Sequence, residues 1–261
     1  MKVFIIGTGN VASALCKAVI DAGHVLTGIA GRDAEQTKRF SKKYKCSTFT
    51  FKEIPDKSDF FILAIKDDAI SEVAKMLPTL SGIVSHTSGT VEMDILKKFP
   101  SRGVFYPVAS ITANHPRNFK KVPICIEGSD EKSFRLLMSL ASSFSNEIYS
   151  LNSEQRAALH VAAVFANNFT NHILGIAFNI LEKKNLPSEL LNSLVLSTVK
   201  NTFSKGSYLA QTGPAVRNDE KTITRHLKFL QKNKEYKELY EIITNQIISV
   251  HNKKRKSKNN G

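Results

Sequence analysis

One segment of this 261-residue chain combines a titratable side chain with amide side chains at helical spacing. His160, Asn167 and Asn171 share one stripe of a straight α-helix, and Asn168 lies about 80° round from it. An imidazole exchanges a proton near neutral pH, because its ordinary pKa is about 6.5. We take His160 and Asn168 as candidate catalytic residues, with structural hydrogen bonding as the alternative for each. Asn167 and Asn171 are weaker candidates, because such asparagines can instead bond across a dimer face.

Polar side chains also follow the strand predicted over residues 82–85. His86 and Ser88 stand there, and Gly89 would let the backbone come close to a ligand. We expect His86 to bind a substrate and Ser88 to take part in the chemistry. The alternative for Ser88 is a cap on a helix over residues 91–98.

A rigid turn, Thr212-Gly213-Pro214, precedes Arg217 in the second half of the chain. An arginine held by such a turn can grip a carboxylate or phosphate with two parallel hydrogen bonds. We therefore expect Arg217 to bind an acidic substrate. The alternative is a surface ion pair between Arg217 and Asp219, which would contribute little energy.

The first apolar run, residues 3–6, leads directly into Gly7-Thr8-Gly9-Asn10-Val11-Ala12 and an apolar-periodic helix pattern. A strand, a glycine turn and a helix in this order are the setting in which G-x-G-x-x-G/A binds the pyrophosphate of a dinucleotide. Gly7 permits the turn, Gly9 lets the backbone approach the phosphates, and Ala12 allows close packing of helix on strand. For Thr8 and Asn10, the alternative is that their side chains only stabilise the turn. The expected cofactor contacts are Gly7, Thr8, Gly9, Asn10, Val11 and, after the strand predicted over residues 60–65, Ile65 and Lys66.

The end of the second predicted strand, residues 25–30, bears on the choice between NAD and NADP. An NAD-selective fold places an acidic residue there to bind the ribose hydroxyls. This chain has Gly31-Arg32-Asp33, and a guanidinium can hold the 2′-phosphate of NADP and stack on adenine. The sequence therefore favours NADP. The alternative is a solvent-facing Arg32, with Asp33 capping the helix over residues 34–44.

The composition is typical of a folded protein, with 42% apolar residues and no run of about 18 of them. A strand begins directly after Met1-Lys2, so we expect no targeting peptide and a cytoplasmic location. Cys16, Cys46 and Cys125 are scattered, which predicts neither disulfides nor a metal site. Five of the cations behind the net charge of +14 lie in residues 253–258. We interpret this run as a solvated, disordered tail, with nucleic-acid binding as the alternative.

Short apolar runs alternate with helical patterns up to about residue 150, and only helical patterns follow. Strands separated by helices predict right-handed crossovers and a mostly parallel, doubly wound sheet. The expected fold is an N-terminal α/β Rossmann domain over residues 1–150 and an all-α domain over 151–252, followed by the tail at 253–261. One long helix is predicted to open at Ser153. The expected strands are 3–6, 25–30, 47–51, 60–65, 82–85, 104–106 and 123–127.

These motifs occur in a familiar order. The chain resembles the 6-phosphogluconate dehydrogenase-like superfamily, which includes pyrroline-5-carboxylate reductase, and more closely the branch in which a Rossmann-like domain precedes a DUF2520 domain. The closer resemblance rests on four segments that span nearly the whole chain except the basic tail: residues 86–89, Tyr106-Pro107-Val108-Ala109-Ser110, His160 with residues 163–169, and residues 212–219.

The resemblance implies a nicotinamide cofactor across the carboxyl ends of the strands, a small-molecule substrate and a homodimer formed by the helical domains. In relatives a serine at the position of Ser88 hydrogen-bonds the substrate. Relatives acting on hydroxy acids carry a proton-transferring lysine one turn before an asparagine. Here Val164 precedes Asn168 and Ala163 precedes Asn167 by one turn, and we expect His160 to replace that lysine.

The resulting hypothesis is an NADP-dependent oxidoreductase that transfers a hydride to or from a small keto, hydroxy or imino acid. The missing lysine supports an alternative hypothesis, a non-catalytic protein that senses nicotinamide nucleotides or binds a partner. The basic tail supports a third and weaker hypothesis, a nucleic-acid-binding protein. We expect neither a membrane nor a metal ion to be involved.

Overall fold

The computed structural model describes residues 1–112 and 119–259. Its contacts divide the chain into two compact units, Met1–Phe169 and Thr170–Gly261. The division falls inside a helical segment, beyond the boundary near residue 150 that the change of sequence pattern suggested.

The first unit is built on one eight-stranded sheet with the order β3-β2-β1-β4-β5-β6-β7-β8. Strands β1 to β6 run parallel, β7 runs antiparallel to β6, and β8 is parallel to β7. The strand order reverses direction at β1, which is where doubly wound sheets bind ligands. The strands are β1 (Lys2–Ile6), β2 (Val25–Ala30), β3 (Ser47–Phe49), β4 (Phe60–Leu63), β5 (Ile83–His86), β6 (Arg102–Pro107), β7 (Ile124–Gly128) and β8 (Ile148–Ser150).

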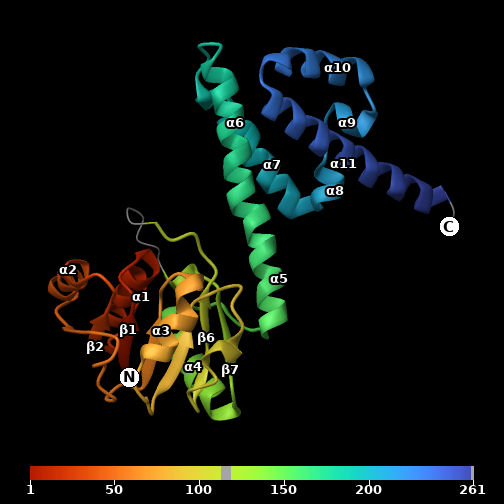
Figure 1. The fold of residues 1–261 in the computed structure, drawn as a ribbon. Helices are drawn as coiled ribbons and strands as arrows, with labels where there is room; N and C mark the ends of the chain where they lie inside the picture. The colour runs from red at the N-terminus through yellow and green to blue at the C-terminus, as the bar shows by residue number, and fades with distance from the viewer. Residues whose placement is uncertain (113–118, 260–261) are drawn as a thin grey trace. The chain divides into compact units, whose positions relative to one another are not determined.

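Helices cover both faces of this sheet (Figure 1). Side chains alternate along β1, so Val3 and Ile5 join one core cluster while Phe4 and Ile6 join the other. The first cluster packs under helices α1, α2 and α4, and the second packs under α3 and a 3-10 turn, η2. These elements and the remaining turns of the unit are α1 (Asn10–Asp21), α2 (Ala34–Tyr44), η1 (Asp67–Ala69), α3 (Ile70–Met76), η2 (Met93–Leu96), η3 (Phe119–Lys121) and α4 (Glu131–Phe144).

The predicted α/β fold is confirmed, and each of the seven expected strands is present with ends shifted by a few residues. Strand β8, which is three residues long, was not predicted. The expected helix over residues 91–98 is only the short turn η2.

The predicted long helix consists of three consecutive segments: α5 (Ser153–Ala163), the π-helix η4 (Val164–Phe169) and α6 (Thr170–Glu182). A capping box starts it, in which Asn152 and Gln155 each accept a hydrogen bond from the other's backbone amide. By length and composition alone, Ser153–Glu182 could cross a membrane, which is weak support for a membrane span because core helices pass the same test.

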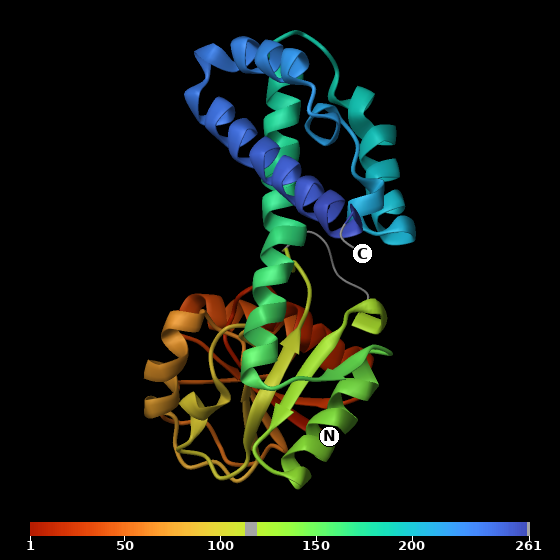
Figure 2. The same cartoon turned by 90° about the vertical axis from the view of Figure 1, so that its right-hand side faces the viewer.

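The second unit is helical throughout its described part, as predicted, and Figure 2 shows α10 and α11 joined by a short turn. Helix α11 continues beyond Asn252, where the sequence pattern placed its end, because lysine and arginine are good helix formers and no breaker intervenes. Residues 260–261 of the expected tail lie outside the described residues. Besides α6, the elements are η5 (Ser188–Leu191), α7 (Asn192–Lys205), α8 (Ser207–Ala210), α9 (Pro214–Arg217), α10 (Glu220–Phe229), η6 (Leu230–Lys232) and α11 (Lys234–Asn259).

Candidate functional site

The turn after β1 can be built only with glycine. Gly7 has φ 132°, and a Cβ added there would lie 2.2 Å from the carbonyl oxygen of Ala64 at the end of β4. The Gly7 amide donates to the Ala30 carbonyl at the end of β2, at 2.7 Å. The end of β1 is therefore packed tightly between its two neighbours, and the chain must turn away at once toward α1.

The amino end of α1 presents backbone amides to open space. Gly9 is the N-cap, and within residues 1–112 and 119–259 no side-chain cap hydrogen bond is present and the first turn has no acidic residue. A Cβ added to Gly9 would meet nothing within 4 Å. Side chains do cap four other helices, α2, α4, α5 and α10, which start after Asp33, Asp130, Asn152 and Asp219. The geometry fits the binding of an anion such as a pyrophosphate at α1.

The other predicted cofactor residues of this loop have different surroundings. Asn10 is exposed at the start of α1, and Val11 is half-buried against the core. The Thr8 carbonyl accepts a hydrogen bond from Gln36 Nε2 at 3.0 Å, and a Cβ added to Gly31 would lie 2.9 Å from Thr8 Cγ2. Thr8 therefore links the loop to α2 and lies close against Gly31, which supports its alternative role in the turn.

Arg32 and Asp33 follow β2 at the same edge. Asp33 caps α2 by accepting from the Gln36 amide at 2.9 Å, the role considered as its alternative. Arg32 is exposed, and among the described residues no hydrogen bond or ion pair engages its guanidinium. After β4, Ile65 packs on the core below Gly7, and Lys66 is exposed. Arg32 and Lys66 are thus available to an anionic ligand.

The loop after β5 is held by its own side chains. Ser88 Oγ donates to Asp67 at 2.7 Å and accepts from the amides of Thr90 and Val91 at 3.1 and 3.0 Å. Thr90 Oγ1 donates to the same Asp67 carboxylate at 2.7 Å. Ser88 is buried, and its hydroxyl proton is already donated to Asp67. Ser88 therefore holds the loop after β5. It does not cap a helix, because the 3-10 turn η2 begins after Glu92.

His86 is fully buried and engaged at both ring nitrogens. Its Nδ1 accepts from the Ser88 amide at 3.2 Å, and its Nε2 lies 3.4 Å from the Glu92 carbonyl. Burial and, to a smaller extent, the nearby Arg156 lower the pKa of His86 to about 4. The expectation that His86 contacts the substrate is corrected: it is a neutral residue that holds the loop, because its side chain points into the protein.

His160 and Tyr106 form a polar pair at the carboxyl edge of the sheet. Tyr106 is at the end of β6, and its Oη lies 3.2 Å from Nδ1 of His160 on α5. The His160 ring lies directly over Gly89, where an added Cβ would be 2.5 Å from Nδ1. Both side chains are half-buried. Sequence reasoning did not single out Tyr106, although a polar residue at the end of a central strand is the signal that would have found it.

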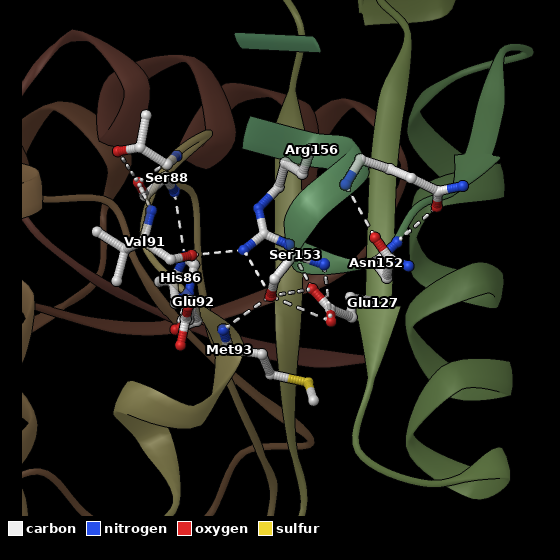
Figure 3. Close-up of polar contacts among 11 residues, drawn as sticks. His86, Ser88, Val91, Glu92, Met93, Glu127, Asn152, Ser153 and Arg156 are labelled. Atoms are coloured by element: carbon white, nitrogen blue, oxygen red, sulfur yellow. Dashed lines mark hydrogen bonds and ion pairs between the residues drawn. The ribbon is translucent and has the colours of Figure 1, made fainter. Parts of the chain in front are cut away.

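A buried ion pair anchors the helix that carries His160 (Figure 3). Arg156, one turn before His160, is 1% exposed and pairs with Glu127 of β7 through Nη1. Its Nη2 donates to the Val91 carbonyl and to Ser153 Oγ, the latter at 3.2 Å. Arg156 therefore joins α5, β7 and the loop after β5. The sequence carries no signal that this arginine is buried.

The π-helix η4 changes which asparagine shares a face with His160. Hydrogen bonding from i to i+5 takes up about one extra residue per turn, which rotates later residues by about 100° against a straight α-helix. This rotation brings Asn168 onto the face of the helix that carries His160 and moves Asn167 off that face. The expected stripe of His160 and Asn167 is wrong for this reason, and Asn168 is the asparagine on the face of His160.

Arg217 belongs to the second unit, at the end of α9, and is exposed. The following Asn218 has a positive φ, and Asp219 then caps α10 by accepting from the Thr222 amide at 3.1 Å. That bond and one from the Thr222 hydroxyl lower the pKa of Asp219. Among the described residues Arg217 and Asp219 form no ion pair within 4.0 Å, so the surface pair considered for them is absent. Asn171 also lies in this unit.

A hollow of about 550 Å³ lies at the opposite, amino edge of the sheet, beside Lys2, Val25 and Asp59. Ligands of doubly wound sheets bind at the carboxyl ends of the strands, so this hollow is not our candidate site. The candidate site is the carboxyl edge from Gly7 to His160.

Two family models match the chain. The model described as "NADP oxidoreductase coenzyme F420-dependent" covers residues 2–89, and the DUF2520 model, described as a domain of unknown function, covers residues 122–247. No curated protein matches the chain.

Solved structures match nearly the whole chain. A crystal structure from Bacteroides fragilis, named as a candidate NADP oxidoreductase, is 31% identical with a TM-score of 0.85, covering 95% of this chain and 98% of that one. A 1-pyrroline-5-carboxylate reductase from Streptococcus pyogenes is 17% identical with a TM-score of 0.65, covering 95% and 98%. An imine reductase from Myxococcus stipitatus in complex with NADP⁺ is 13% identical with a TM-score of 0.64, covering 98% and 95%. At 17% and 13% identity, the last two structures show only that the fold is similar.

Proposed function

The chain belongs to the family of NADP oxidoreductase-like proteins in which a Rossmann-like domain precedes a DUF2520 domain, and from this premise we propose that it is an NADP-dependent oxidoreductase of small keto, hydroxy or imino acids. The observation that carries the proposal is the shared sheet edge. Open, uncapped amides of α1 lie at one end of it, and the Tyr106–His160 pair lies at the other.

The cofactor would be held by the amides that follow Gly7 and Gly9, with Lys66 and Arg32 as cations for its phosphates. When bound, it would supply or accept the hydride. The chain's own residues then have to orient the substrate and move one proton. His160 exchanges that proton, and Asn168 hydrogen-bonds the reacting oxygen or nitrogen. Arg217, in the second unit, is a separate candidate for binding an acidic group.

The test begins with binding and proceeds to turnover. Titration calorimetry with NADPH, NADP⁺ and NADH is expected to give saturable binding, tightest for the phosphorylated coenzymes. A panel of 2-oxo acids and cyclic imines with NADPH, followed by absorbance at 340 nm, is expected to give turnover. Absence of heat with every coenzyme would overturn the proposal. Tight binding with no turnover on any substrate would instead favour a non-catalytic nucleotide sensor, which the missing lysine at Val164 supports.

Replacing Arg32 with alanine is expected to weaken NADPH binding about 10- to 100-fold and to leave NADH binding unchanged. The reason is the loss of a charge-assisted contact of about 1.5–3 kcal/mol with the 2′-phosphate, which NADH lacks. Calorimetry on both coenzymes measures the difference. Arg135→Ala is the matched control, because Arg135 is equally exposed but lies on α4 in a surface pair with Glu131. Equal loss for NADPH and NADH would contradict this role.

Asn168→Ala is expected to lower kcat/KM about 10- to 100-fold, while Asn167→Ala changes it less than threefold. A removed amide donor to the reacting atom has effects of this order or larger. The π-helix is the reason for the asymmetry, since it brings only Asn168 to the His160 face. Asn167 and Asn168 are adjacent, of the same residue type and both exposed, so each variant serves as the control for the other. A larger loss with Asn167→Ala would restore the straight-helix interpretation.

We also propose that a second copy of the chain covers the helical unit, and that the protein is cytoplasmic. Large apolar side chains stand exposed on α7, with Phe203 at 87%. Light scattering after gel filtration is expected to give a dimer, and Leu196→Asp with Phe203→Asp is expected to give a monomer. Asn201→Asp on the same helix is the control for added charge. A monomeric wild-type protein would exclude this interface.

A further inference from the structure

The hydrogen bond between Tyr106 and His160 bears on which ring nitrogen of His160 carries the proton. Nδ1 lies 3.2 Å from Tyr106 Oη, and among the described residues Nε2 has no partner. In a neutral imidazole one nitrogen donates and the other accepts, so the group bound at Nδ1 decides the state of Nε2. Whichever group donates in this bond therefore determines whether Nε2 of His160 is a hydrogen-bond donor or an acceptor toward a ligand.

Tyr106 is surrounded so that it keeps its proton. Burial raises the pKa of its hydroxyl, and the neighbouring Cys125 and Asp67 raise it further, while Arg156 opposes them. Asp67 is itself held in place by the hydroxyls of Ser88 and Thr90. A protonated phenol is a good donor, and the lone pair of Nδ1 is the acceptor within reach.

The packing around His160 restricts rotation of its imidazole ring. Gly89 lies under Nδ1, Cγ and Cβ of His160, at 2.5, 2.9 and 3.0 Å from the position a Cβ would take. The Arg156–Glu127 ion pair fixes α5 one turn earlier. Exchanging the two ring nitrogens would turn Nδ1 away from Tyr106 and place Nε2 elsewhere, with loss of the bond. The surroundings thus specify one orientation of the imidazole.

We propose that Tyr106 is a positioning residue: its hydroxyl donates to Nδ1 of His160, so that the neutral imidazole carries its proton on Nε2 and offers that N–H to the substrate. This rests on the proposed function. It also specifies what His160 binds, because an N–H donor binds an acceptor. The reacting atom is then an oxygen, or a nitrogen that carries a free lone pair, and a protonated iminium nitrogen does not fit.

Nitrogen-15 NMR of histidine-labelled protein tests the tautomer without any coenzyme or substrate. His160→Gln identifies the His160 signals among those of the seven histidines. In the wild-type protein at neutral to mildly alkaline pH, we expect Nε2 to be protonated and Nδ1 to be unprotonated. Tyr106→Phe is expected to give a mixture of tautomers. Tyr149→Phe is the matched control, since Tyr149 is 51% exposed on β8, and it should leave the spectrum unchanged.

Kinetics supply the second measurement. Tyr106→Phe is expected to lower kcat about tenfold and to change KM little, the loss expected for one hydrogen bond of about 1.4 kcal/mol. A wild-type spectrum with the proton on Nδ1, or a Tyr106→Phe spectrum identical to wild type, would overturn the inference. Because these spectra need no coenzyme, failure of coenzyme binding would remove the proposed function and leave the tautomer result standing. The two failures are therefore distinguishable.

Discussion

Replacing His160 with alanine is expected to lower kcat by about 100- to 10,000-fold on the substrate that the panel identifies. That range is the usual contribution of a positioned proton-transfer group. Binding of NADPH should not change, because the amides that would hold its phosphates follow Gly7 and Gly9 on another element. Steady-state kinetics and calorimetry on the same preparation separate the two effects.

His172→Ala is the matched control for His160. His172 is exposed on α6, and its removal should leave kcat within a factor of two. Gly89→Ala provides an independent check, since the new Cβ would collide with the His160 ring and should lower kcat as well. Unchanged turnover in His160→Ala would show that this histidine does not move the proton.

Replacing Glu127 with alanine is expected to lower the free energy of unfolding of the first unit by about 3–5 kcal/mol. Removing one partner of a buried ion pair leaves the other charge without compensation. Arg156 is 1% exposed, and its Nε has no hydrogen-bond partner in the part of the chain that the structure describes. Urea unfolding followed by far-ultraviolet circular dichroism measures the change, since the chain has no tryptophan.

Glu131→Ala is the control for this stability effect. Its pair with Arg135 has side chains 71% and 76% exposed, and an exposed pair contributes less than about 1 kcal/mol. The double variant Glu127→Ala with Arg156→Met should recover part of the loss, because no buried charge is then left alone. Equal losses for Glu127→Ala and Glu131→Ala would show that burial does not strengthen the first pair.

The ion pair also connects stability to the site. Arg156 fixes the first turns of α5 against β7 and against the Val91 carbonyl. His160 follows one turn later on the same helix and lies over Gly89 of the same loop. We therefore attribute the placement of the proposed proton-transfer group to the buried Arg156 and its contacts with Glu127 and Val91.

The glycine turn, the helix starts and the strands could be predicted from the sequence, because they depend on residues that are neighbours in the chain. Gly7 and Gly9 could be assigned to a tight turn at the start of α1, since a strand, two glycines and a helix follow one another in the chain. The cap by Asp33 and the start of α5 at Ser153 follow from side chains within three residues of the helix end. The seven strands followed from short apolar runs.

The roles of individual polar residues depended on contacts between distant segments. His86 and Ser88 stand where a substrate residue is expected, yet the structure uses them to hold their own loop, because His86 is buried and Ser88 reaches Asp67. Tyr106 and His160 are 54 positions apart, and no periodicity links them.

The sequence by itself determined the alternation of strands and helices and the glycine turn, since each depends on neighbours a few residues away. Only the tertiary structure decided which polar side chains face the site, because that depends on strand pairing, on the buried Arg156–Glu127 contact and on the extra residue taken up in η4.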